Sequence, residues 1–401
     1  MKILMISSYL PYPLFSGGHV RLFNILKELS KKHKITLICE KRDYQTKEDE
    51  AVVRKYCDRI FTVPRVKQWS LRNILKTGVS FYPFLLIGHT NKLMNRQIKE
   101  MLDNEKFDLI HAETFYIMQN IPKTNIPVVL VEHNIEYLVY KRYADQSSII
   151  AKTILYADVL KMKFWEKRFW GKAGRLVAVS EEEKNVMEQE GIKNVSVVPN
   201  GVDIAEFRIQ NSEFRIDKEK RILFLGDFKW VKNTDAVEWL IKDIWPLFIP
   251  MWNSIETKQE VKLWIVGRKI PEKIKKLGKN DKNIIFDEDA PSEAQDIFRK
   301  ADLLVAPIRV GGGTSFKILE AMAMGIPVVT TPLGIEGIKA RPEKDVLIGS
   351  EAPEIAAKMS RILHDEIMYG EISKNARILI EREYSWEKIV KELENVYNSL
   401  V

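Results

Sequence analysis

The chain has 401 residues, of which 45% are hydrophobic and 29% are charged, with 63 Lys and Arg residues against 55 Asp and Glu. This length is sufficient for two domains with separate cores, and the composition excludes a fibrous, low-complexity or disordered protein. Two cysteines, Cys39 and Cys57, exclude a disulfide scaffold, and the longest apolar stretch is about half of the roughly 20 residues that span a membrane.

Short β-branched runs alternate with amphipathic stretches along the chain, a pattern typical of parallel sheets covered by helices. The N-terminal residues 1–13 have a short apolar run but no cleavage site, so we interpret them as a first strand. In the first half we expect strands at residues 2–7, 34–39, 59–63, 107–112, 127–132, 175–180 and 195–199. In the second half we expect strands at residues 221–226, 261–267, 283–286, 302–307 and 326–330.

A polar, charged segment at residues 200–220 separates the two sets of strands and predicts a link between domains. We therefore predict an N-terminal Rossmann-like domain over residues 1–205 and a C-terminal Rossmann-like domain over residues 206–385. The last helix, residues 386–401, follows the second sheet, and we expect it to pack back on the first domain.

The charge is unevenly distributed, with a net charge of +10 for residues 1–200 and −2 for the remainder. No acidic residue occurs from 59 to 99, where basic residues alternate with Trp69, Phe81, Tyr82 and Phe84, and a second basic and aromatic cluster follows at 161–175. These residues form either an ordinary solvated face beside core aromatics or a surface for anionic lipid or an anionic acceptor.

The loop after the first strand lacks the G-x-G-x-x-G pattern of nicotinamide and flavin enzymes, which disfavours a dehydrogenase. Instead, Gly17 and Gly18 open the next helix. Their backbone amides at the positive end of that helix are suited to a phosphate group, although a plain turn explains such a pair as well.

The strongest local signal runs from Arg309 to Val329, RVGGGTSFKILEAMAMGIPVV. Three glycines follow a strand and lead directly into a helix, so several N–H groups can point at an anion without interference from a Cβ atom. Two helical turns further on, the Glu320 carboxylate is suited to accept hydrogen bonds from the two hydroxyls of a ribose. The alternative is a flexible glycine-rich turn with a surface glutamate.

In these residues the chain resembles glycosyltransferase family 4, whose GT-B architecture has two Rossmann-like domains facing each other across a cleft. The resemblance extends over most of the chain. It includes MKILMIS with Gly17, Gly18 and Arg21, then VLVEHNIEY, PNGVD, and Gly226 with Lys232 six residues later. Glu320 matches the second glutamate of the family's Glu-x7-Glu motif.

The resemblance implies transfer of a hexose from a nucleotide-sugar donor to a saccharide, glycan or lipid-linked acceptor, with retention of configuration. Glu320 would hold the ribose of the donor, Lys232 would neutralise its diphosphate, and His133 would lie beside the donor sugar. The expected donor site also includes the loop residues Arg309, Gly312, Gly313, Thr314, Ser315 and Lys317. No metal or other cofactor and no nucleic-acid partner is expected, and the Asp287–Asp289 motif is interpreted as an acidic loop.

His133 has a structural alternative, because a single histidine at a strand end often serves only as a hydrogen-bonding residue. Its acidic neighbours Glu132 and Glu136 favour a functional role, since they are expected to polarise the imidazole.

The sequence departs from the family pattern at two positions. The first glutamate of the motif is replaced by Gly312, and the arginine after the strand glycine is replaced by Asp227. Lys317, Arg309 and Lys229 are the candidates to restore the missing positive charge.

Other functions remain open at this point. A nucleotide-sugar epimerase, a glycoside phosphorylase and a non-catalytic GT-B scaffold share the architecture. A cytoplasmic protein is expected, and the basic first domain leaves open peripheral attachment to the inner face of the membrane.

Overall fold

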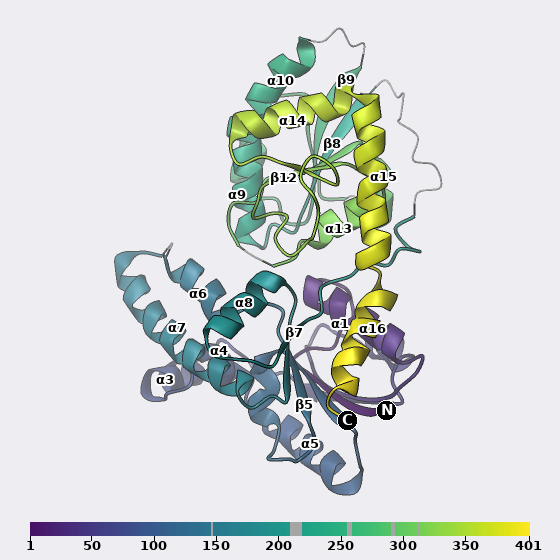
Figure 1. Cartoon of the computed structure of the whole chain (residues 1–401). Coiled ribbons are helices and arrows are strands. Elements are labelled where there is room, and N and C mark those ends of the chain that lie inside the picture. Colours follow the sequence, from purple (N-terminus) through teal and green to yellow (C-terminus); the bar gives the residue numbers. More distant parts are fainter. Residues whose placement is uncertain (146, 209–218, 255–258, 290–292, 312) are drawn as a thin grey trace. The chain divides into compact units, whose positions relative to one another are not determined.

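The computed structural model describes residues 1–145, 147–208, 219–254, 259–289, 293–311 and 313–401, and the chain divides into two units (Figure 1). Unit 1 comprises Met1–Pro199 and Ile389–Val401, and unit 2 comprises Asn200–Lys388. The sequence placed these boundaries at 205/206 and 385/386. The first boundary is earlier because the backbone of Val202 is already bonded to Tyr384 and Ser385 of unit 2.

Unit 1 contains a seven-stranded parallel sheet of order β3-β2-β1-β4-β5-β6-β7. Its strands are β1 Lys2–Ser7, β2 Lys34–Lys41, β3 Arg59–Pro64, β4 Leu109–Glu113, β5 Val128–Val131, β6 Arg175–Ala178 and β7 Val195–Val197. Its helices are α1 Gly17–Leu29, α2 Lys47–Arg54, α3 Leu71–Val79, α4 Phe84–Gly88, α5 Lys92–Asn104, η1 Phe115–Asn120, α6 Glu136–Asp145, α7 Ile149–Trp170 and α8 Glu181–Gln189.

The core of unit 1 forms where alternate side chains of the central strands meet the covering helices. Leu4, Ile110 and Leu130 of the sheet pack in one buried cluster with Met162 and Trp170 of α7. Strands buried on both faces read as continuous apolar runs, which is why the sequence predicted them well.

Unit 2 contains a six-stranded parallel sheet of order β10-β9-β8-β11-β12-β13. Its strands are β8 Glu219–Leu225, β9 Glu260–Val266, β10 Ile284–Asp287, β11 Leu303–Ala306, β12 Val328–Thr330 and β13 Leu347–Ile348. Its helices are α9 Val231–Trp239, η2 Leu240–Ile244, α10 Trp245–Asn253, α11 Glu272–Gly278, α12 Ala294–Phe298, α13 Phe316–Ala323, α14 Ala352–His364 and α15 Glu366–Glu383.

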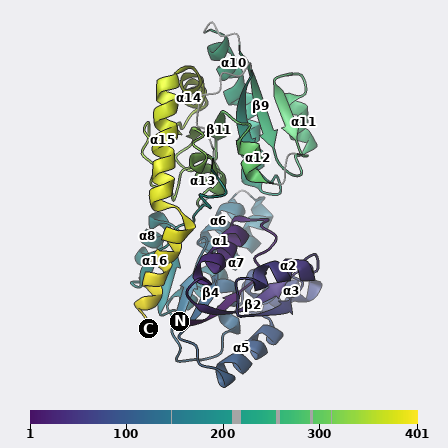
Figure 2. The same ribbon diagram turned by 90° about the vertical axis from the view of Figure 1, so that its right-hand side faces the viewer.

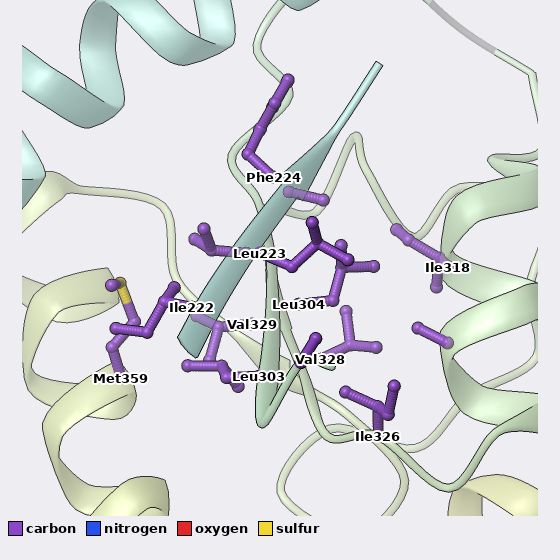
Figure 3. Packing of buried hydrophobic residues seen from close by; sticks show 14 of the residues in the cluster. Ile222, Leu223, Phe224, Leu303, Leu304, Ile318, Ile326, Val328, Val329 and Met359 are labelled. Carbon is purple, nitrogen blue, oxygen red and sulfur yellow. The ribbon is translucent and has the colours of Figure 1, made fainter. Parts of the chain in front are cut away.

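Helices lie on both sides of the second sheet: η2 packs against α11 and α14 on one side, and α13 packs against α15 on the other. Helices α14 and α15 lie side by side in Figure 2. Figure 3 shows how strand residues such as Leu223, Leu304 and Val329 fill the interior between Ile318 of α13 and Met359 of α14. Removal of this apolar surface from water is the main favourable contribution to folding of the unit.

The last helix, α16 Trp386–Asn398, begins in unit 2, and its residues from Ile389 onwards belong to unit 1. Its residues Ile389, Leu393 and Tyr397 are fully buried. Glu394 also accepts a 2.9 Å hydrogen bond from Nε2 of His33, just after α1. These contacts tie the C-terminus to unit 1.

In both sheets the strand order reverses beside the first strand of the unit, between β1 and β4 and between β8 and β11. Ligands of doubly wound folds bind at the carboxyl ends of strands near such a reversal. Among the described helices, none is both long enough and apolar enough to cross a membrane.

Candidate functional site

A glycine-rich loop connects β11 to α13 in unit 2. Gly311 and Gly313 have φ angles of +111° and +82°, a region that favours glycine. A Cβ atom on Gly311 would lie 3.2 Å from Cδ of Lys232, so the side chain of Lys232 runs close against this loop. Gly312, predicted to belong to the donor site, lies outside the described residues.

An open pocket lies at this loop and brings together residues that are far apart in sequence. Four of the residues predicted for the donor site line it, and three apolar or glycine positions complete the lining. The lining residues are Lys232, Ile308, Gly313, Ser315, Lys317, Leu333 and Gly334. Two lysines and the start of a helix therefore converge on one cavity, an arrangement suited to an anion.

Lys317 is held in this pocket by a neighbour that the sequence did not single out. Its Nζ donates a 3.0 Å hydrogen bond to Oδ1 of Asn233 and lies 4.7 Å from the centre of the Phe224 ring. The amide of Asn233 in turn donates a 2.7 Å hydrogen bond to the backbone carbonyl of Asp227. Asn233 thus connects the loop after β8 with the pocket.

The two lysines of the pocket share an environment that disfavours their charge. Burial, together with the nearby charge of Lys232, lowers the pKa of Lys317 to about 7. Burial also lowers the pKa of Lys232. A bound phosphate would relieve both effects, because an opposite charge favours the protonated form.

Glu320 lies in α13 about one helical turn beyond Lys317 and is not one of the residues that line the pocket. Burial and the charge of Glu206 raise the pKa of Glu320 to about 7, although Lys317 opposes this rise. A buried carboxylate of this kind is stabilised most by hydrogen bonds from neutral donors, such as the hydroxyls of a ribose.

The two remaining positively charged candidates of unit 2, Arg309 and Lys229, differ from Lys317 in their contacts. Arg309, expected at the donor site, instead forms a two-pronged ion pair with Asp235, and its guanidinium lies 4.4 Å from the centre of the Trp239 ring. Lys229 is exposed. Of the three candidates to replace the family arginine, only Lys317 lines the pocket.

Asp227, which takes the place of the family arginine, accepts a 2.9 Å hydrogen bond from Arg268. Thr314 lies within the glycine-rich loop, and in the described part of the chain its buried hydroxyl has no hydrogen-bond partner. A buried hydroxyl without a partner is costly unless a ligand or water satisfies it.

His133, two residues after the end of β5 in unit 1, belongs to a chain of hydrogen bonds that runs into the interior of the unit. Its Nε2 lies 2.6 Å from one carboxylate oxygen of Glu113, and the other oxygen lies 2.6 Å from Nε2 of His111. Nδ1 of His111 lies 2.5 Å from the hydroxyl of Tyr397 in α16. His133 keeps 16% of its side chain exposed, whereas Glu113 and His111 are fully buried.

The structure adds a partner of His133 that the sequence did not indicate, Glu113. Of the two expected acidic neighbours, Glu136 interacts electrostatically with His133. The oxygens of Glu132 instead accept hydrogen bonds from Nε1 of Trp170 and the backbone N–H of Phe115. Burial opposes ionisation of Glu113, yet its two histidine partners outweigh burial and hold its pKa well below the usual range.

Gly17 and Gly18 form the start of α1 beside His133. A Cβ atom on Gly18 would lie 3.0 Å from the hydroxyl of Tyr9 and 3.2 Å from Nδ1 of His133, closer than side chains normally approach. The side chain of Ser16 does not cap α1, because its hydroxyl lies 2.6 Å from Nδ1 of His19. Gly18 therefore allows the helix start to approach His133.

Strained backbone marks the same end of the first sheet. Thr114, next to Glu113, has a φ angle of +70°, which is rare and costly for a β-branched residue. Such strain is concentrated at functional sites in proteins. Sequence reasoning missed Glu113, His111 and Tyr397, although Glu113 could have been found as the last residue of a buried strand.

The predicted acidic loop of unit 2 forms hydrogen bonds within the fold. Asp287 and Glu288 of the predicted acidic loop accept hydrogen bonds from Trp264 and from the backbone of Ile270. Within the described residues, no group of three or more His, Cys, Asp or Glu side chains has an arrangement that could hold a metal ion.

Comparison with known sequences matches both units. Residues 15–206 match Glycosyltransferase Family 4, and residues 219–365 match Glycosyl transferases group 1. An uncharacterized 44.6 kDa protein in the cps region of Klebsiella pneumoniae is 23% identical over 405 residues, which is 98% of either chain. A GDP-mannose-dependent monoacylated alpha-(1-6)-phosphatidylinositol monomannoside mannosyltransferase of Corynebacterium glutamicum is 25% identical over 215 residues, 50% of this chain and 55% of that protein.

Solved structures share the fold at low sequence identity. Sucrose-phosphate synthase from Thermosynechococcus elongatus is similar with a TM-score of 0.73 and 16% identity, over 100% of this chain and 99% of that one. HepE of Anabaena, solved in complex with UDP, is similar with a TM-score of 0.66 and 16% identity over the whole of both chains. With its two parallel-sheet α/β units and its matches in both, the chain belongs to glycosyltransferase family 4 and has the GT-B fold.

Proposed function

We propose that this glycosyltransferase transfers a hexose from a nucleotide-sugar donor to a hydroxyl of an acceptor, with retention of configuration and without a metal ion. The observation that carries the proposal is the pocket of unit 2, where Lys232, Lys317 and the amides of the glycine-rich loop surround a space suited to a diphosphate. Glu320 would hold the ribose of the same donor.

The chemistry follows from the charge that the reaction creates. When the bond between the anomeric carbon and the diphosphate oxygen breaks, negative charge develops on the leaving diphosphate. That charge would be stabilised by Lys232, Lys317 and the start of α13. These groups are already in position before the bond breaks, so no solvent has to reorganise, and such preorganisation is the most effective form of electrostatic catalysis. The acceptor oxygen forms the new bond to the anomeric carbon, and its proton passes to the leaving phosphate.

His133 has a separate role in this proposal. The imidazole, oriented by Glu113, would form a hydrogen bond with a hydroxyl of the donor sugar and hold the sugar in place while the donor bond breaks. Orientation by a buried carboxylate fixes which ring nitrogen carries the proton.

We propose a saccharide, glycan or lipid-linked acceptor and a cytoplasmic reaction. In support of a lipid-linked acceptor, the Corynebacterium glutamicum relative is named as acting on a phosphatidylinositol monomannoside. In support of a nucleotide-sugar donor, the solved HepE structures contain UDP or UDP-glucose.

A thermal-shift panel of UDP-, GDP-, ADP- and CMP-sugars tests the donor site, because a ligand that binds the native state raises its stability. We expect one nucleotide series to stabilise the protein, and Glu320→Ala to weaken binding of that nucleotide about ten- to a hundredfold. A folded Glu320→Ala variant with unchanged affinity would remove Glu320 from the site.

Activity with the best donor then separates the remaining functions. Sugar transfer that requires an acceptor supports a transferase, whereas donor conversion without an acceptor indicates an epimerase. Release of a sugar phosphate with inorganic phosphate indicates a phosphorylase.

A further inference from the structure

Helix α3 of unit 1 is oriented with its polar side inwards. Asn73 is buried, and its amide donates hydrogen bonds of 2.9 and 3.1 Å to the carbonyls of Lys67 and Gln68. The apolar side chains of the helix point outwards, with Leu71, Leu75 and Val79 exposed by 73%, 63% and 90%. A surface helix of a soluble protein normally buries its apolar side, so this face requires an explanation.

The exposed face of α3 is held in place by α7. Nζ of Lys161 donates hydrogen bonds of 2.7 and 2.8 Å to the carbonyls of Thr77 and Ser80 at the end of α3. The ring of Phe81 packs 4.9 Å from that of Phe164, a partly exposed residue of α7. The apolar face therefore belongs to a defined structure that continues onto α7.

This face, the α3 surface, combines apolar and basic side chains. Its apolar members are exposed residues of α3, its flanks and α7, and its basic members are exposed residues within or just before α3. The α3 surface consists of Trp69, Leu71, Ile74, Leu75, Val79, Phe81 and Phe164 with Lys67, Arg72 and Lys76. Among the described residues, no acidic side chain forms an ion pair with these three basic residues.

The structure also removes several residues from the broader basic and aromatic region that the sequence suggested. Arg59 is paired with Glu105, and Arg65 is bonded to Glu40. In the second cluster, Phe169 and Trp170 are buried in the core of unit 1. The α3 surface keeps both its charge and its apolar area exposed.

We propose that the α3 surface docks unit 1 on an anionic lipid bilayer. An interfacial helix inserts its apolar side about 5–10 Å into the boundary between headgroups and acyl chains, while nearby Lys and Arg residues contact anionic headgroups. A second copy of this chain is a poorer occupant, because a two-fold contact would place the same basic residues opposite each other. Docking does not depend on the proposed sugar transfer, but it would bring unit 1 to a lipid-linked acceptor.

Cosedimentation with phosphatidylcholine vesicles, with and without phosphatidylglycerol, tests this proposal on the full chain. The charge variant is Lys67→Gln, Arg72→Gln, Lys76→Gln, and the apolar variant is Leu71→Ser, Leu75→Ser, Val79→Ser. The matched control, Lys92→Gln, Arg96→Gln, Lys99→Gln, removes the same charge from exposed positions of α5 in the same acid-free segment.

We expect the wild type to sediment with anionic vesicles and to be released near 1 M salt, where the Debye length falls to about 3 Å. Each basic residue contributes about fivefold in affinity, so the charge variant should bind roughly 100-fold more weakly. The apolar variant should lose at least about tenfold, and the control should stay within about twofold.

Three results would overturn the proposal. These are equal or absent sedimentation with both kinds of vesicle, an equal loss in the control, and self-association through the α3 surface without lipid, detected by sedimentation velocity. The thermal shift with the best nucleotide is measured on every variant in parallel. Vesicle binding by a protein that binds no nucleotide would contradict the proposed function and leave the docking proposal standing.

Discussion

At the scale of single residues, the hydrogen-bond chain from Tyr397 to His133 is the feature with the clearest consequence for catalysis. Glu113 contacts both histidines through separate oxygens at 2.6 Å. Glu113→Gln keeps the shape of the side chain but removes the charge that orients both rings. We expect turnover to fall by about 10–100-fold, as misplacement of a group by about 1 Å does elsewhere, while nucleotide affinity is unchanged.

The measurement is steady-state turnover together with calorimetry of nucleotide binding. Tyr397→Phe is the milder companion, because it keeps the ring and removes only the hydroxyl that meets His111. Loss of nucleotide affinity in step with turnover would show that Glu113 supports the fold in general and not His133.

The lowered pKa of Lys317 predicts that nucleotide binding depends on pH. Its pKa in the free protein is lowered to about 7, and a bound diphosphate should raise that value. A group whose pKa rises on binding takes up a proton, so at pH 8 binding should consume protons and affinity should decline as pH increases above 7. Glu320 does not turn this proton uptake into proton release at pH 8, because its pKa of about 7 leaves the carboxyl mostly ionised there.

Calorimetry in buffers of different ionisation enthalpy measures this proton uptake. Lys317→Met should abolish it. Binding that is independent of the buffer in the wild type would show that Lys317 does not meet the phosphate.

The role of a residue could be predicted from the sequence only where the residue belongs to a motif of neighbouring positions with a characteristic spacing. The glycine-rich loop, Lys232 and Glu320 stand in recognisable motifs, so the sequence could nominate them. Asn233 and Tyr397 could not be nominated, because each acts through a contact across the fold, with Lys317 and His111 respectively. The ion pair of Arg309 could not be predicted either, because its partner Asp235 is 74 positions away.

At the scale of elements, burial on both faces made the strands predictable. The expected strands in both halves are present, and the one that was missed, β13, has only two residues. The orientation of α3 was not predictable, because an amphipathic pattern shows that two faces differ but not which is buried. The hydrogen bonds of Asn73 decide that orientation.

Helix α16 offers a test of stability at this scale. Leu393 is fully buried in unit 1, so Leu393→Ala should destabilise this unit by about 2–5 kcal/mol. Lys391→Ala, two residues away on the exposed side, should change stability by less than about 0.5 kcal/mol. Hydrogen exchange of the β1 and β4 amides reports on unit 1 specifically, and equal exchange in both variants would mean that α16 is only loosely attached.

At the scale of the whole molecule, the two units carry different functional groups. Unit 2 holds the groups suited to a diphosphate, and unit 1 holds His133 and the α3 surface. The chain passes between the units twice, near residue 200 and within α16. Two-domain organisation could be predicted from the two sets of strands, but the exact boundaries depend on contacts such as that between Val202 and Tyr384.

The most direct test of the proposed glycosyl transfer measures the release of nucleoside diphosphate together with the transfer of the sugar to an acceptor. With the donor that stabilises the protein most, Lys232→Ala should lower turnover by about 10²–10³, the usual effect of losing one preorganised charge-stabilising group. Lys229→Ala, three positions earlier and exposed, is the matched control and should retain wild-type turnover. A wild-type protein that binds a nucleotide sugar but releases no nucleoside diphosphate with any saccharide or lipid-linked acceptor would contradict a catalytic role and indicate a non-catalytic GT-B scaffold.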